Sequence, residues 1–154
     1  MYANSIFGTN QIVSVDDTGL DWDNIYYRDN SQPIYYDKDS DTICESPNYL
    51  HRKVVAYNAY YDTFDLNSSG HGTHTSGSVA GDSLGSNFPG DTIISRAAGM
   101  APNAKLMFVD LGGAGDGLYT PLDYNRIYTW AYNGGARITS SSWGPGAPAA
   151  SSYT

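Results

Sequence analysis

Two histidines stand close together in a segment of small residues, and histidine is the side chain best suited to moving protons near neutral pH. His71 and His74 are two of the three histidines in the chain, and both lie in "SSGHGTHTSGSVAG", residues 68–81. A helix over Gly70–Gly81 would place both near one face. Its small residues would let it pack closely against a sheet beside an open cleft. The pair indicates either acid–base chemistry or two hydrogen-bonded core histidines.

A pair of carboxylates ends the first apolar run of the chain. The run "QIVSVDD", residues 11–17, is rich in β-branched residues, which is typical of a buried parallel strand. Asp16 and Asp17 come at its carboxyl end, and Thr-Gly follows. A carboxylate held there can accept a hydrogen bond from an imidazole and stabilise the imidazolium. The alternative is a turn in which the aspartate binds only backbone amides.

Metal binding is the weaker interpretation of these residues. The zinc-helix pattern His-Glu-x-x-His is absent, because the two histidines enclose only Gly and Thr. Three aspartates alternate along "DKDSD" as the ligands of a calcium loop do: Asp37, Asp39 and Asp41. That loop has Thr42 where glycine is needed and Asn48 where glutamate is needed. We therefore assign no metal ligand and expect a solvated acidic loop, with structural calcium as the open alternative.

The elements that must position these residues alternate between strands and helices. Four apolar segments bounded by turn residues are predicted strands: residues 11–17, 52–62, 103–111 and 136–144. A helix is predicted to start with Thr120 as its cap and to end at Gly134 and Gly135. Its apolar stripe comprises Leu122, Ile127, Trp130 and Ala131. The alternation predicts an α/β fold with a parallel sheet and right-handed crossovers.

Composition narrows the class of protein. The 154 residues are enough for one ordinary domain. Leu20 to Leu50 are rich in Asp, Asn, Ser and Tyr and are predicted to form a surface insertion of that domain.

A net charge of -8 with eight Lys and Arg argues against a nucleic-acid partner. Cys44 is the single cysteine and cannot form an internal disulfide. The sequence shows neither a signal peptide nor an apolar run long enough for a membrane span.

Four blocks of the chain resemble a known family in content and in order. These blocks are "IVSVDDTGLD", "GHGTHTSGSVAG", "GMAPNAKL" and "ITSSSWG". They are similar to the aspartate, histidine and substrate-strand blocks of the subtilisin-like serine proteases (peptidase S8), over Gly8 to Trp143. The resemblance implies a three-layer α/β fold in which helices flank a parallel sheet. It also implies a serine endopeptidase that acts on polypeptides, in a secreted or endomembrane setting.

The resemblance also implies a role for particular residues. Asp17 corresponds to the triad aspartate and Asp16 to its neighbour in the strand. His71 corresponds to the general base, and His74 to a structural histidine of the same helix. Two segments would flank the substrate backbone, and their implied contacts are Gly113 and Gly117 on one side and Ser142, Trp143 and Gly144 on the other.

One part of the family pattern is missing. The asparagine of the oxyanion hole and the Gly-Thr-Ser block of the nucleophile do not occur after Trp143. We therefore expect residues 1–154 to be the amino-terminal part of a catalytic domain, inactive without the serine-bearing half. A catalytically dead binding module with the same fold is the main alternative, and a metal-dependent hydrolase is the weaker one.

Overall fold

A five-stranded parallel sheet forms the centre of the computed structural model, which describes residues 4, 6–38, 42–66, 69–83, 98–113 and 115–144. The strand order is β2-β3-β4-β1-β7. The strands are β1 (Ile12–Asp17), β2 (Tyr36–Asp37), β3 (Val54–Asn58), β4 (Lys105–Asp110) and β7 (Ile138–Ser140). The four strands predicted from the sequence are confirmed, and β2 is additional.

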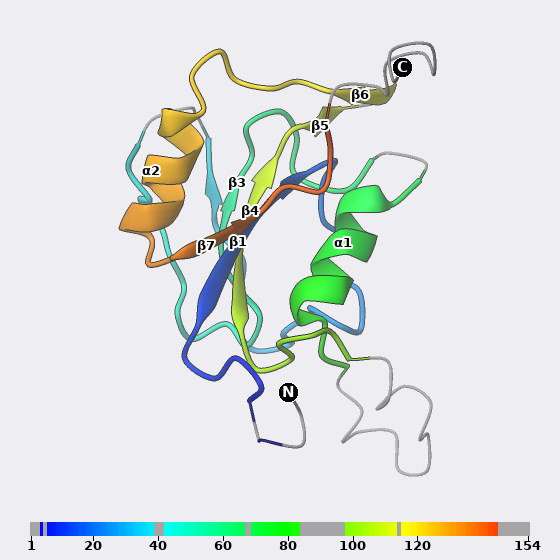
Figure 1. Ribbon diagram of the computed structural model, residues 1–154, viewed down its shortest axis with the longest axis vertical. Coiled ribbons are helices and arrows are strands. Elements are labelled where there is room, and N and C mark those ends of the chain that lie inside the picture. The colour runs from blue at the N-terminus through cyan, green and yellow to red at the C-terminus, as the bar shows by residue number, and fades with distance from the viewer. Residues whose placement is uncertain are drawn as a thin grey trace, which may run out of the picture.

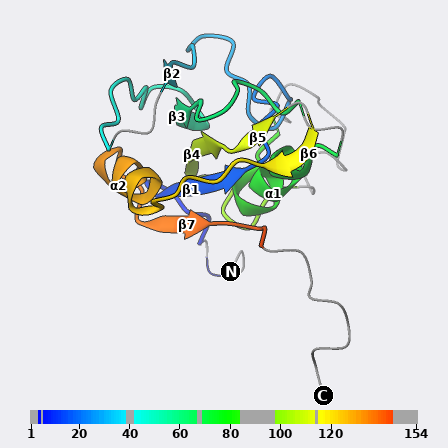
Figure 2. The ribbon, with the colours of Figure 1, turned by 90° about the horizontal axis from the view of Figure 1, so that it is seen from above.

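Two helices lie on opposite faces of this sheet, as Figures 1 and 2 show. Helix α1 (His71–Ala80) covers one face, and α2 (Asn125–Asn133) covers the other. A short antiparallel pair, β5 (Gly112–Gly113) and β6 (Gly115–Leu118), follows β4. The arrangement of helix, sheet and helix confirms the predicted three-layer α/β architecture.

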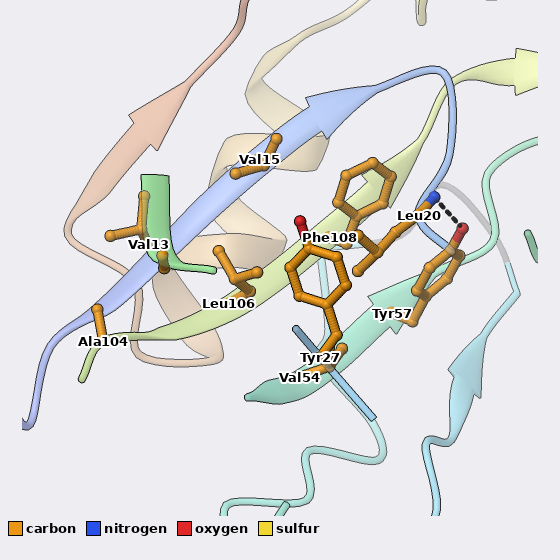
Figure 3. Close-up of a cluster of buried hydrophobic side chains, with 10 residues drawn as sticks. Val13, Val15, Leu20, Tyr27, Val54, Tyr57, Ala104, Leu106 and Phe108 are labelled. Carbon is orange, nitrogen blue, oxygen red and sulfur yellow. Dashed lines mark hydrogen bonds between the residues drawn. The ribbon is translucent and has the colours of Figure 1, made fainter. Parts of the chain in front are cut away.

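Alternating side chains divide the core between the two faces. On the α1 face, Val13 and Val15 of β1 pack with Leu106 and Phe108 of β4 (Figure 3). On the α2 face, Met107 and its neighbours pack against the helix residues Ile127, Trp130 and Ala131. Burying each large aliphatic or aromatic side chain contributes about 1.5–3 kcal/mol, which holds β1 rigidly in the middle of the sheet.

Helix α2 begins later than the sequence predicted. Its first residue is Asn125, whose N–H donates to Oδ1 of Asp123 at 3.0 Å, so Asp123 takes the capping role expected of Thr120. Leu122 therefore precedes the helix and is fully exposed, whereas it was expected in the apolar stripe. The other three stripe residues are buried as predicted.

Residues 20–50 are more than a surface insertion. Leu20 and Tyr27 are buried in the core on the α1 face, where the backbone N–H of Leu20 donates to the Tyr57 hydroxyl (Figure 3). Strand β2 extends the sheet by pairing with β3. Polar composition concealed these contacts, because the buried residues are spaced too widely to give a periodic pattern.

The acidic stretch of this segment makes a different contact from the one expected. Oδ2 of Asp37 is buried and accepts hydrogen bonds from Nε1 of Trp130 at 2.9 Å and from the N–H of Glu45 at 3.2 Å. Asp39 and Asp41, the other two members of the predicted loop, lie outside the described residues. Asp37 thus joins β2 to α2 instead of standing in a solvated loop.

Candidate active site

Asp17 and His71 are in direct contact at the carboxyl edge of the sheet. Nδ1 of His71 lies 2.7 Å from Oδ1 of Asp17, which is fully buried at the end of β1. The same carboxylate accepts the Thr18 N–H at 2.7 Å and the Thr75 hydroxyl at 3.2 Å. Because a carboxylate only accepts, Nδ1 is the donor of this contact, and the tautomer that fits it has its lone pair on Nε2. The imidazole is 43% exposed, so Nε2 can meet a second reactant.

The first turn of α1 is held in place by Asp65. Oδ2 of Asp65 accepts from the Thr73 N–H at 3.1 Å and from its hydroxyl at 2.6 Å, which caps the helix. Oδ1 accepts the Thr18 hydroxyl at 3.3 Å, and Oγ1 of Thr18 accepts the Gly72 N–H at 2.9 Å. Asp65 therefore ties the residue after Asp17 to the residues after His71. Sequence analysis missed this residue, although an acidic residue ahead of a helix start is a capping signal.

Close backbone contact explains the small residues around His71. A Cβ added to Gly72 would lie 2.1 Å from the Gly19 carbonyl oxygen and 3.1 Å from Cβ of Asp17. No side chain fits between α1 and the turn after β1, so only glycine allows His71 to reach the carboxylate. The small residues here bring the helix close to the sheet, as the sequence predicted.

The two segments expected to flank a substrate lie on either side of Asp17. The strand order places β1 between β4 and β7, and the carboxyl ends of all three parallel strands meet at one edge. Residues 111–117 follow β4, and residues 142–144 lie beyond β7. The topology therefore brings both segments to the edge that holds the Asp17–His71 pair.

The individual residues of these segments differ in their surroundings. A Cβ on Gly113 would lie 2.2 Å from the Tyr61 ring, which stacks on Tyr119 with centroids 4.0 Å apart. Gly117 and Gly144 have open space where a Cβ would stand. Ser142 is exposed, whereas Trp143 is half-buried and stacks on Tyr124 at 6.1 Å.

The sequence model of the family described as the subtilase family matches residues 8–153 of this chain. The chain belongs to the subtilase family. Over about nine tenths of its length it is similar to three proteins of Dictyostelium discoideum, named serine protease/ABC transporter B family proteins tagB, tagD and tagA, at 37%, 39% and 30% identity. The chain spans only 6% to 7% of the length of these relatives.

The subtilase chain carries a second buried carboxyl beside the first. Asp110 at the end of β4 is the register partner of Asp17 and is completely buried. Burial, together with the adjacent Asp62 carboxyl, raises its pKa to about 9, against hydrogen bonds from the Tyr57 hydroxyl and the Gly112 N–H. A neutral Asp110 can donate to Asp62, whose buried Oδ2 has no other partner among the described residues. No periodic or motif signal marks this pair.

His74 departs from its expected place in this subtilase chain. It is exposed on α1 and lines a cavity of about 590 Å³ between α1 and β7, together with Val13, Val79 and Ile138. The expectation of a packed structural histidine does not hold within the described residues. The helix turns Gly72 and Ser76 toward the sheet instead, since these positions are the buried ones.

The described residues hold neither a metal-ligand cluster nor a membrane-spanning helix. In the ranges given above, no three His, Cys, Asp or Glu side chains gather closely enough to hold an ion. Within the same ranges, no helix has the length and apolarity that crossing a membrane requires.

Proposed function

We propose that this chain supplies the acid–base half of a serine endopeptidase active site. The observation that carries the proposal is the 2.7 Å contact between buried Asp17 and half-exposed His71. In the proposed reaction, Nε2 of His71 takes the proton from a serine hydroxyl as its oxygen attacks a peptide carbonyl. His71 then returns the proton to the leaving amine, and Asp17 keeps the ring oriented and stabilises its charged form. The serine belongs to a segment outside residues 1–154.

Polypeptide substrates fit the geometry around this pair. An extended peptide lying between residues 111–117 and 142–144 would pass across the exposed ring of His71. Its main-chain groups would pair with the backbone near Gly113 and Gly117 and with Ser142, Trp143 and Gly144. Main-chain pairing is independent of side chains, so we expect broad specificity, with Trp143 shaping one apolar wall.

The test is peptide hydrolysis by the complete catalytic domain, in which this chain is joined to its serine-bearing segment. We expect turnover of a fluorogenic peptide that His71→Ala lowers by several orders of magnitude in kcat, with folding unchanged by circular dichroism. His74→Ala is the matched control, since His74 is one helical turn away and exposed. Turnover that survives His71→Ala, or no turnover by the folded wild type, would contradict the proposal. The chain of residues 1–154 alone should show no turnover above background.

A further inference from the structure

Asp16 and Asp17 are consecutive in β1, so their side chains point to opposite faces of the sheet. Asp17 holds His71 on the α1 face. On the other face, Oδ1 of Asp16 accepts the Ser141 hydroxyl at 2.8 Å, and Oδ2 accepts Nε1 of Trp143 at 3.2 Å. One dipeptide therefore holds both the proposed general base and the proposed substrate segment.

The segment after β7 depends on these side-chain bonds. Strand β7 pairs with β1 only from Val13–Ile138 to Val15–Ser140, and the ladder ends there. Beyond it, Ser141 and Trp143 are bonded to Asp16, and the indole also donates to the Asp16 carbonyl oxygen at 2.8 Å. Asp16 itself is only 1% exposed, whereas Ser141 and Ser142 are exposed. Hydrogen bonds to the buried side chain of Asp16 thus hold the chain in place where its backbone pairing with β1 ends.

We propose that Asp16 is a positioning residue for the peptidase reaction: its ionised carboxylate fixes residues 141–144 against the Asp17–His71 pair, and protonation weakens this hold. The inference rests on the proposed function, because it assumes that residues 142–144 bind substrate. It adds to that function a residue which makes no contact with substrate and a dependence of substrate binding on pH.

The chemistry of the carboxyl supports the pH dependence. An ionised carboxylate only accepts, so it can satisfy the Ser141 hydroxyl and the Trp143 indole together. Protonation removes the negative charge that strengthens both bonds and turns one carboxyl oxygen into a donor, so the hold on Ser141 and Trp143 weakens, while the indole keeps its bond to the Asp16 carbonyl oxygen. Burial raises the pKa of Asp16 to about 6, with these two hydrogen bonds opposing the rise. The switch therefore falls in the mildly acidic range.

Among the residues that the structure describes, few charged or titratable groups face Asp16 from the packed elements. Asp17, its neighbour in β1, contributes to the raised pKa of Asp16 by charge repulsion. The β4 residue beside it in register is Val109, and the residues after β7 contribute Ser141 and Trp143. Ahead of α2, Tyr124 contributes a ring stacked on the indole. The proton on Asp16 is therefore controlled chiefly by burial and by the two donors from the substrate segment.

The kinetic test compares Asp16→Asn with wild type in the complete catalytic domain between pH 5 and 8. At pH 8 we expect KM to rise by about tenfold, the loss of one hydrogen bond to a charged group, with kcat within about twofold. Wild-type KM should rise as pH falls through 6, whereas the variant KM should stay flat. Asp16→Glu, which restores the charge, should recover part of the loss. Equal KM values for Asp16→Asn and wild type at every pH would overturn the proposal.

A second measurement does not depend on activity. In ¹H–¹⁵N spectra of the same domain, the indole N–H of Trp143, assigned with Trp143→Phe, should titrate with a midpoint near pH 6 in wild type. It should not titrate in Asp16→Asn, and an indole that titrates equally in both overturns the inference. If the wild type has no peptidase activity, the proposed function fails, while the indole titration still decides the role of Asp16. If Asp16→Asn does not fold, Ser141→Ala combined with Trp143→Phe must raise KM by the same factor.

Discussion

Asp17 and Asp110 are neighbours in the parallel ladder of β1 and β4, and both side chains are buried at the same edge of the sheet. Their partners differ in kind. Asp17 contacts an imidazole, which favours a carboxylate, whereas Asp110 contacts the Tyr57 hydroxyl and the Asp62 carboxyl, with a pKa near 9. Adjacent positions of one sheet edge thus hold an acid that contacts an imidazole and a second acid that joins neighbouring segments through a hydroxyl and a carboxyl.

Asp110 should make the stability of the domain fall as pH rises. The pKa of Asp110 is raised on folding, so the folded state holds a proton that the unfolded state releases above about pH 4. The stabilisation is complete below about pH 4 and is lost as pH rises through about 9, with a slope of up to about 1.4 kcal/mol per pH unit. Urea unfolding of the complete domain at pH 5, 7 and 9 should show this slope in wild type and its loss in Asp110→Asn. Parallel pH curves for the two proteins would show that Asp110 is ionised in the folded state.

Removing the cap of α1 should affect both stability and catalysis. Asp65→Ala takes away the acceptor of three hydrogen bonds, from Thr18 and Thr73, and we expect a loss of about 1–2 kcal/mol in the free energy of unfolding. Because those bonds set the place of the first helical turn, kcat should also fall, by roughly tenfold.

The matched control is Asp123→Ala, which removes the cap of α2 on the opposite face of the sheet. It should lower stability by a comparable amount and leave kcat unchanged. Thermal unfolding and peptide kinetics of both variants distinguish the roles. Equal kcat values for the two variants would mean that Asp65 supports the helix without positioning His71.

The tight contact at Gly72 should tolerate no added methyl group. Gly72→Ala places a Cβ 2.1 Å from a backbone oxygen, so we expect a loss of at least about 2 kcal/mol in stability and a large loss of kcat. Gly117→Ala meets nothing within 4 Å and serves as the control, with stability within about 0.5 kcal/mol of wild type. Denaturant midpoints measure both effects. A Gly72→Ala domain as stable as the control would show that α1 can move away from the sheet at little cost.

Sequence reasoning located the strands from local signals, whereas it selected Asp17 and His71 as the proposed catalytic pair only through the resemblance to the subtilisin-like family. The β-branched run of residues 11–17 indicates a strand within one segment. The helix at 71–80 was only a conditional expectation, because its Gly and Ser residues have low helix propensity. The start of α2 was predicted wrongly because the side chain of Asp123, and not that of Thr120, accepts the hydrogen bond that caps the helix.

The remaining contacts are long-range, and their residues carry no pattern. Asp16 meets Trp143, and Tyr57 meets Asp110, only because the strand order brings distant segments to one edge. The sequence therefore predicted which side chains could do chemistry, while the bonds that position them required the structure.

The strand order also bears on how the chain acquires its fold. Both neighbours of β1 come later in the sequence, since Ile12 pairs with Lys105 and Val13 pairs with Ile138. During synthesis at about 5–20 residues per second, the apolar side chains of β1 stay exposed for several seconds, until β4 has been synthesised and can pair with β1. Such non-local pairing gives slow folding and a prolonged period of exposed strand edges. The Asp17–His71 pair therefore forms late in folding. We expect the exposed apolar side chains of β1 to determine how strongly the folding chain depends on chaperones.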